Sequence, residues 1–170
     1  MSAIHRIIFV CTDNTCRSIM AEAVMKSISR GKQLDILSRG LVVLFPEPLN
    51  PKAVAVLAGN QLAPGKTSSE ALAKEDLTEG TLLLTMTGKE AAQVKESFPR
   101  ASLVYTLGEF AGKPGDVEEP HGGSLAEYGA CLEYVDLLVK LAAERLLRVQ
   151  EKLEQKAPQV VPIRNGVTEN

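Results

Sequence analysis

A cysteine ends the first apolar segment of this chain, and a helical pattern begins shortly after it. Residues 4–10 are rich in β-branched and aromatic side chains, which is typical of a strand buried on both faces. The segment ends at Cys11, and from Arg17 apolar residues recur at spacings of three and four until Gly31. A buried strand, a polar loop and a helix predict the first unit of an open parallel sheet, whose ligands bind at this turn.

Strand and helix patterns alternate along the rest of the chain. The sequence predicts further strands at residues 34–37, 81–86 and 103–106, and helices at 53–57, at 89–97 and from Ser124 onward. This alternation predicts an α/β fold, a single three-layer domain with a central parallel sheet of about four strands and a flavodoxin-like architecture. Residues 108–123 contain five glycines and two prolines, so we expect an exposed loop there.

The last helix carries an apolar stripe with a strict spacing of three and four. Its members are Leu125, Tyr128, Leu132, Val135, Val139, Ala142, Leu146, Val149 and Leu153. We expect this stripe to pack against the sheet, although the same spacing would suit a partner helix. Beyond residue 156 no periodicity remains, so we expect one folded domain over residues 1–156 and a mobile tail over 157–170.

Composition restricts the classes of function. The formal net charge is -2, so no general basic field is available to bind nucleic acid or an anionic membrane, and no apolar run approaches the ~20 residues that span a bilayer. Three cysteines do not suit a disulfide framework but do suit a cytoplasmic protein with reduced thiols. Neither His5 nor His121 has the spacing of a metal ligand, so we expect no metal and no cofactor.

Residues 11–18 combine the groups that phosphate chemistry requires. A loop that turns into a helix N-terminus directs backbone N–H groups at one point, and the helix dipole adds positive potential. That field suits a phosphoryl dianion and a thiolate, so we expect the pKa of Cys11 to fall below the ~8.5 of a free cysteine. Arg17 would hold two phosphoryl oxygens, Ser18 would hydrogen-bond the sulfur, and Asn14 would keep the loop open in a left-handed conformation.

The cysteines also allow other interpretations. Cys11 could be a buried structural residue, since cysteine behaves as a small hydrophobe in many cores. Cys16 could form a disulfide with Cys11 under oxidation, which would make the protein redox-sensitive, or could only pack beneath the loop. Cys131 lies beside the apolar stripe and is most simply a core residue.

Two segments carry a resemblance to a known family. Residues 9–22, FVCTDNTCRSIMAE, and residues 119–124, EPHGGS, resemble the signature loop and the general-acid loop of the low-molecular-weight protein-tyrosine phosphatases. The likeness covers roughly residues 4–150 and is nearest to the bacterial protein-arginine phosphatase branch, which carries threonine at the position of Thr15. It implies a phosphotyrosine phosphatase I-like fold and hydrolysis of phosphoarginine or phosphotyrosine in a phosphorylated protein through a phosphocysteine intermediate. We expect a monomer, or a weak homodimer.

The resemblance also implies residue roles. It assigns catalysis to Cys11, Arg17 and Glu119, with Asp116 or Glu118 as the alternative acid, and substrate contacts to Thr12, Asp13, Asn14, Thr15, Cys16, Ser18 and His121. Asp13 replaces the family's glycine, Glu119 its aspartate, His121 its aromatic residue and Ile19 a proline. These departures leave open a weakened or inactive phosphate-binding relative. A thiol-based arsenate reductase would need two further cysteines, and the chain has none between Cys16 and Cys131.

Overall fold

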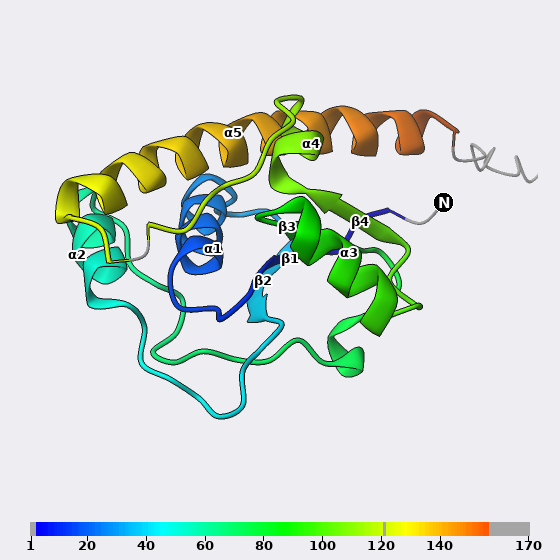
Figure 1. The fold of residues 1–170 in the computed structure, drawn as a ribbon. Coiled ribbons are helices and arrows are strands. Elements are labelled where there is room, and N and C mark those ends of the chain that lie inside the picture. Colours follow the sequence, from blue (N-terminus) through cyan, green and yellow to red (C-terminus); the bar gives the residue numbers. More distant parts are fainter. Residues whose placement is uncertain (1–2, 121, 157–170) are drawn as a thin grey trace, which may run out of the picture.

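Four parallel strands form the centre of the computed structural model, which describes residues 3–120 and 122–156 (Figure 1). They are β1 Arg6–Cys11, β2 Asp35–Gly40, β3 Thr81–Thr85 and β4 Leu103–Thr106, in the spatial order β2-β1-β3-β4. At the C-terminal edge of the sheet Cys11 pairs with Gly40, and Val10 pairs with Thr85. The predicted α/β fold with a four-stranded parallel sheet is confirmed.

Helices cover both faces of this sheet. They are α1 Arg17–Ile28, α2 Pro51–Gly59, α3 Gly88–Ser97, α4 Leu107–Ala111 and α5 Leu125–Lys156, with one 3-10 turn, η1 Lys74–Asp76. Side chains from alternate positions of β1 pack into two separate apolar clusters, Ile7 and Phe9 with α1 and α5, and Ile8 and Val10 with α3. The two clusters give the three layers that the sequence predicts.

The long helix α5 runs along α1, α2 and α4 (Figure 1). Its stripe is buried from Tyr128 to Leu146 and joins the same cluster as Phe9, as expected, so this part of the helix finds its partner within the domain. Leu125 at its start is exposed. Near its far end, the side-chain amide of Gln150 bonds both backbone groups of Ile4, which ties the helix to the chain just before β1.

The expectation of an exposed loop over residues 108–123 is wrong for its first part. Residues Leu107–Ala111 form α4, because the Thr106 hydroxyl accepts from the N–H of Glu109 while the Glu109 carboxylate accepts from the N–H of Thr106. Gly112, at φ 78°, ends the helix in the left-handed conformation that glycine adopts without strain. Counting glycines overlooked this reciprocal cap.

Two expectations fall on parts of the chain that the structure does not describe. The tail of residues 157–170 and the side chain of His121 lie outside the described residues. Within the described ranges, the structure contains no helix that is both long and apolar enough to span a lipid bilayer.

Candidate active site

The segment from β1 to α1 wraps around the sulfur of Cys11. The Ser18 Oγ lies 2.9 Å from the Cys11 Sγ, and the backbone N–H of Asn14 donates to that sulfur over 3.2 Å. Asn14 has φ 59°, and its side-chain amide donates to Ser18 Oγ over 2.8 Å while its Oδ1 accepts from the N–H of Glu70. The hydrogen bond between Ser18 and the sulfur and the left-handed conformation of Asn14 are both as expected. The Asn14 side chain, however, bonds Ser18 and the backbone of Glu70 on another segment rather than the backbone of its own loop, and its role in holding the loop open stays a prediction.

The connection that follows β2 forms backbone hydrogen bonds with this loop. The N–H groups of Leu41 and Val42 donate to the carbonyls of Cys11 and Thr12 over 3.1 Å and 2.8 Å. Gly40 makes this approach possible, since a Cβ at that position would lie 3.0 Å from the carbonyl carbon of Asp13. The connection after β2 therefore holds the loop at the C-terminal edge of the sheet.

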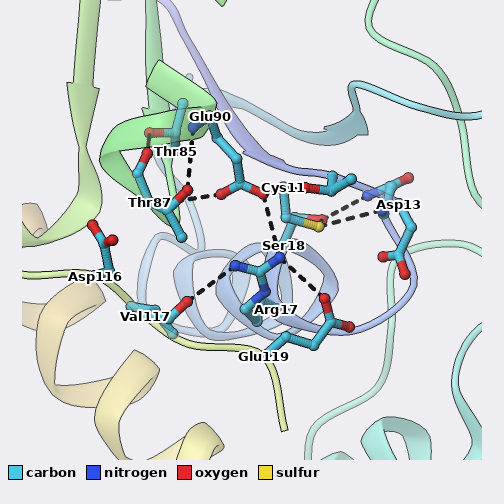
Figure 2. A network of polar contacts seen from close by, with 12 residues as sticks. Cys11, Asp13, Arg17, Ser18, Thr85, Thr87, Glu90, Asp116, Val117 and Glu119 are labelled. Atoms are coloured by element: carbon cyan, nitrogen blue, oxygen red, sulfur yellow. Dashed lines mark hydrogen bonds and ion pairs between the residues drawn. The ribbon is translucent and has the colours of Figure 1, made fainter. Parts of the chain in front are cut away.

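From the start of α1, the Arg17 side chain extends toward the segment that carries Val117 and Glu119 (Figure 2). Its Nη1 donates to the carbonyl of Val117 over 3.0 Å, and its Nη2 lies 3.3 Å from Glu90 Oε2 and 3.1 Å from Glu119 Oε2. The Nε atom is buried and has no hydrogen-bond partner among the described residues. Burial lowers the pKa of Arg17, but the surrounding negative charges outweigh it and raise that pKa above its ordinary value. The guanidinium stays charged and retains one unused donor.

Glu90 is a functional candidate that the sequence analysis missed. Its Oε1 accepts from the N–H of Thr87, its Oε2 accepts from the Thr12 hydroxyl over 2.8 Å, and the same Oε2 contacts Arg17. The Glu90 side chain is 4% exposed. The only local signal was the Thr-x-x-Glu spacing of a capping box, which indicates a helix start but not a contact with a loop about 75 residues away.

A hollow of about 390 Å³ opens beside Arg17. It is lined by Thr12, Asp13, Arg17, Thr87, Lys89, Glu90, Gln93, Glu118 and Glu119. Four of these residues carry carboxylates and two carry positive charges, so the walls are acidic overall. Within the loop, the Asp13 Oδ1 accepts from the N–H of Thr15 over 3.1 Å.

The Cys11 thiol behaves differently from the expectation of a lowered pKa. Burial raises the pKa of Cys11 above its ordinary value, although the Ser18 hydrogen bond and the charge of Arg17 lower it. The sulfur is fully buried, and Arg17 already faces two carboxylates that offset its positive charge. The sequence shows the stabilising groups around the thiol but not the burial or these two carboxylates.

The other predicted site residues of the described chain do not line the hollow, and they are Cys11, Asn14, Thr15, Cys16, Ser18 and Asp116. Asp116 accepts a 2.9 Å hydrogen bond from the N–H of Gly88 at the start of α3, and it does not line the hollow. Thr15 and Cys16 are buried members of the loop, and the carbonyl of Thr15 accepts from the N–H of Asn50. The structure therefore brings Thr12, Asp13, Arg17 and Glu119 to one hollow, with Glu118 beside them.

All three cysteines are free thiols. Burial raises the pKa of Cys16 strongly and raises that of Cys131 to about 11, and negative neighbours add to both shifts. Among the described residues, neither thiol has a hydrogen bond that lowers its pKa, as the Ser18 hydrogen bond lowers that of Cys11, so Cys11 is the best nucleophile of the three. A disulfide between Cys11 and Cys16 stays a prediction.

Comparison with known proteins agrees with this geometry. The family model "Low molecular weight phosphotyrosine protein phosphatase" matches residues 6–159. A protein-arginine-phosphatase from Bacillus subtilis is 36% identical over 144 residues, and the match covers 82% of this chain and 95% of the relative. The protein-tyrosine-phosphatase PtpB of Staphylococcus haemolyticus is 33% identical over 134 residues, and the match covers 79% of this chain and 94% of the relative.

Solved structures give the same result. The YwlE arginine phosphatase from Geobacillus stearothermophilus superposes with a TM-score of 0.80 at 31% identity, covering 91% of this chain and 99% of its own. A cysteine-to-serine mutant of YwlE with a phosphorylated active-site serine has a TM-score of 0.79 at 34% identity, covering 86% and 98%. The chain belongs to the low molecular weight phosphotyrosine protein phosphatase family.

Proposed function

We propose that this protein hydrolyses a phosphorylated protein side chain, with Cys11 as the nucleophile. The Cys11 thiolate attacks phosphorus, an S–P bond forms as the bond to the leaving group breaks, and an acid protonates the leaving group. Water then attacks phosphorus with the same residue acting as base, which releases phosphate and restores the thiolate. In a related YwlE protein, the serine that replaces the active-site cysteine carries a phosphoryl group, which supports a covalent step at this position.

One observation carries this proposal: a buried sulfur and an unused buried donor share one loop. The Cys11 sulfur contacts Ser18 and the N–H of Asn14, and Arg17 Nε is buried without a partner among the described residues. An unsatisfied buried donor is costly, and a phosphoryl oxygen at Nε would remove that cost. The N-cap of α1, Cys16, provides no side-chain hydrogen bond to the first turn, so N–H groups there are suited to the same anion.

Glu119 is proposed as the acid and base. It lies on the segment that faces the loop, and its carboxylate is 3.1 Å from the Arg17 Nη2, at the guanidinium that would bind the phosphoryl group. Asp116 is engaged at the start of α3 instead. A bound phosphoryl group would compete for Arg17 and free Glu119 to reach the leaving group.

Phosphoarginine is the proposed substrate. Related proteins include both arginine and tyrosine phosphatases, so membership of the family does not choose between them. Thr15 matches the arginine branch, and the acidic walls of the hollow suit a cationic leaving group better than a neutral phenol. We further propose that the protein is a monomer and acts on phosphorylated proteins in the cytoplasm. The free thiols support the cytoplasmic location.

The test is a phosphatase assay on matched peptides that carry phosphoarginine or phosphotyrosine. Wild type should release phosphate, Cys11→Ser should release none, and Arg17→Lys should lose about two orders of magnitude in kcat/KM, because lysine lacks the planar fork. Glu151→Gln, which changes an exposed residue near the far end of α5, is the control and should match wild type. Equal turnover by wild type and Cys11→Ser would refute the mechanism.

The substrate assignment needs its own variant. Thr15→Ile places a bulkier aliphatic side chain at a buried position of the loop and should shift preference from phosphoarginine toward phosphotyrosine. An unchanged preference would contradict assignment to the arginine branch through Thr15.

A further inference from the structure

Asp13 brings a negative charge into the loop that should receive a phosphoryl dianion. Its Oδ1 accepts a 3.1 Å hydrogen bond from the N–H of Thr15, and its side chain lines the same hollow as Arg17. One backbone donor of the loop is therefore already bonded to a carboxylate of the chain. An entering dianion meets a like charge beside the amides that would bind it.

The charge of Asp13 reaches both reactive groups. Burial is the main cause of the raised pKa of Cys11, and the Asp13 carboxylate raises that pKa further. Burial lowers the pKa of Arg17, but the negative charges around it raise this pKa, and the charge of Asp13 is one of them. The charge of Asp13 therefore affects the pKa of both Cys11 and Arg17.

The other lining residues do not compensate for this charge. Asp13, Glu90, Glu118 and Glu119 face Arg17 and Lys89, so four carboxylates oppose two cations in the described walls. A phosphate monoester brings two more negative charges and no positive charge. Phosphoarginine carries a guanidinium bonded directly to phosphorus, so its positive charge would lie within a few ångströms of these carboxylates.

We propose that Asp13 is a specificity-determining residue that selects substrates by charge. It weakens the binding of phosphate monoesters such as phosphotyrosine and favours N-phosphorylated cationic groups such as phosphoarginine. The inference rests on the proposed function, because it requires the phosphoryl group to bind between the loop and Arg17. Asp13 forms no bond to phosphorus and takes no part in proton transfer.

Asp13→Asn tests this role because asparagine keeps the size of the side chain and the Oδ1 acceptor for Thr15. Removing one like charge at this range should raise the ratio of kcat/KM for a phosphotyrosine peptide to kcat/KM for a matched phosphoarginine peptide by about tenfold. The wild-type discrimination should also shrink as salt is added. Glu151→Gln removes one exposed charge near the far end of α5 and should leave this ratio unchanged. An unchanged ratio in Asp13→Asn would overturn the proposal.

Phosphate binding separates this inference from the proposed function. Inorganic phosphate should raise the Tm of Asp13→Asn more than that of wild type, with a Kd lower by about tenfold, and this measurement needs no turnover. Equal Kd values in the two proteins would refute the role of Asp13 even if hydrolysis by Cys11 is established. If Cys11→Ser instead retains wild-type turnover, the proposed mechanism fails while the phosphate measurement still decides the charge effect.

Discussion

Arg17 and Glu119 form an ion pair across the hollow, with 3.1 Å between Nη2 and Oε2 and side chains that are 5% and 11% exposed. In this arrangement a carboxylate of the chain contacts the guanidinium that is proposed to bind phosphoryl oxygens (Figure 2). If Arg17 binds the phosphoryl group and Glu119 is the acid, as proposed, substrate binding and the release of Glu119 are linked, because both anions compete for one cation. Without substrate, the ion pair keeps Glu119 beside Arg17.

Glu119→Gln should separate these two effects. Glutamine keeps the length and an acceptor for Arg17 but cannot donate a proton as an acid, so kcat for a peptide with a poor leaving group should fall about 10²- to 10³-fold. An aryl phosphate with a good leaving group should lose much less. The pH profile should also lose the limb that requires the protonated acid. Asp116→Asn and Glu118→Gln are the comparisons, and a larger loss in either would move the role of acid to that residue.

Glu90 is proposed to be a positioning residue for Arg17 and Thr12. Glu90→Gln would weaken a charge-assisted contact in a buried site and should lower stability by about 1–3 kcal/mol. It should also lower kcat more than it raises KM, because Arg17 would be less well oriented in the transition state. Glu96→Gln on the exposed end of the same helix is the matched control. A loss of stability with unchanged kcat would show that Glu90 supports the fold alone.

The loop after β1 and the connection after β2 approach closely at Gly40, where only glycine fits without displacement. A Cβ at this position would lie 2.6 Å from Val43 Cγ2 and 3.0 Å from Asn14 Cβ, so Gly40→Ala should destabilise the protein by about 1–3 kcal/mol and displace the loop. Gly129 in α5 has nothing within 4 Å of the same position, and Gly129→Ala should stabilise by up to about 1 kcal/mol. Urea unfolding of both variants measures the contrast. Equal effects would contradict the packing at Gly40.

The buried thiols make stability depend on pH. Because burial raises the pKa of Cys16, the folded state keeps a proton that the unfolded chain releases above its own pKa of ~8.5. This contribution is complete below that pH and is lost as the pH rises, by about 1.4 kcal/mol per pH unit for one thiol. Urea unfolding at pH 7 and pH 10 should therefore show a smaller fall in Cys16→Ala than in wild type. Identical falls would argue against a protonated buried Cys16.

Local sequence determined most of the elements and the chemistry of the loop. The strand at residues 103–106 was predicted with its observed bounds, and the helix predicted at residues 89–97 begins one residue earlier, since apolar period and capping residues act over a few positions. One strand-to-helix connection contains Cys11, Asn14, Arg17 and Ser18, so their spacing alone indicated an anion site. The prediction failed at α4 because the local cap formed by Thr106 and Glu109 was not recognised.

Tertiary packing decided what faces that loop. Glu90 on α3, Val117 and Glu119 lie 73 to 102 residues from Arg17, and only the parallel order of β1, β3 and β4 brings them to one edge. The pKa of Cys11 likewise depends on burial and on charges from distant segments, which no local pattern encodes. Sequence determined which groups could do the chemistry, whereas packing decided which charges surround them, because electrostatic interactions depend on distance in space.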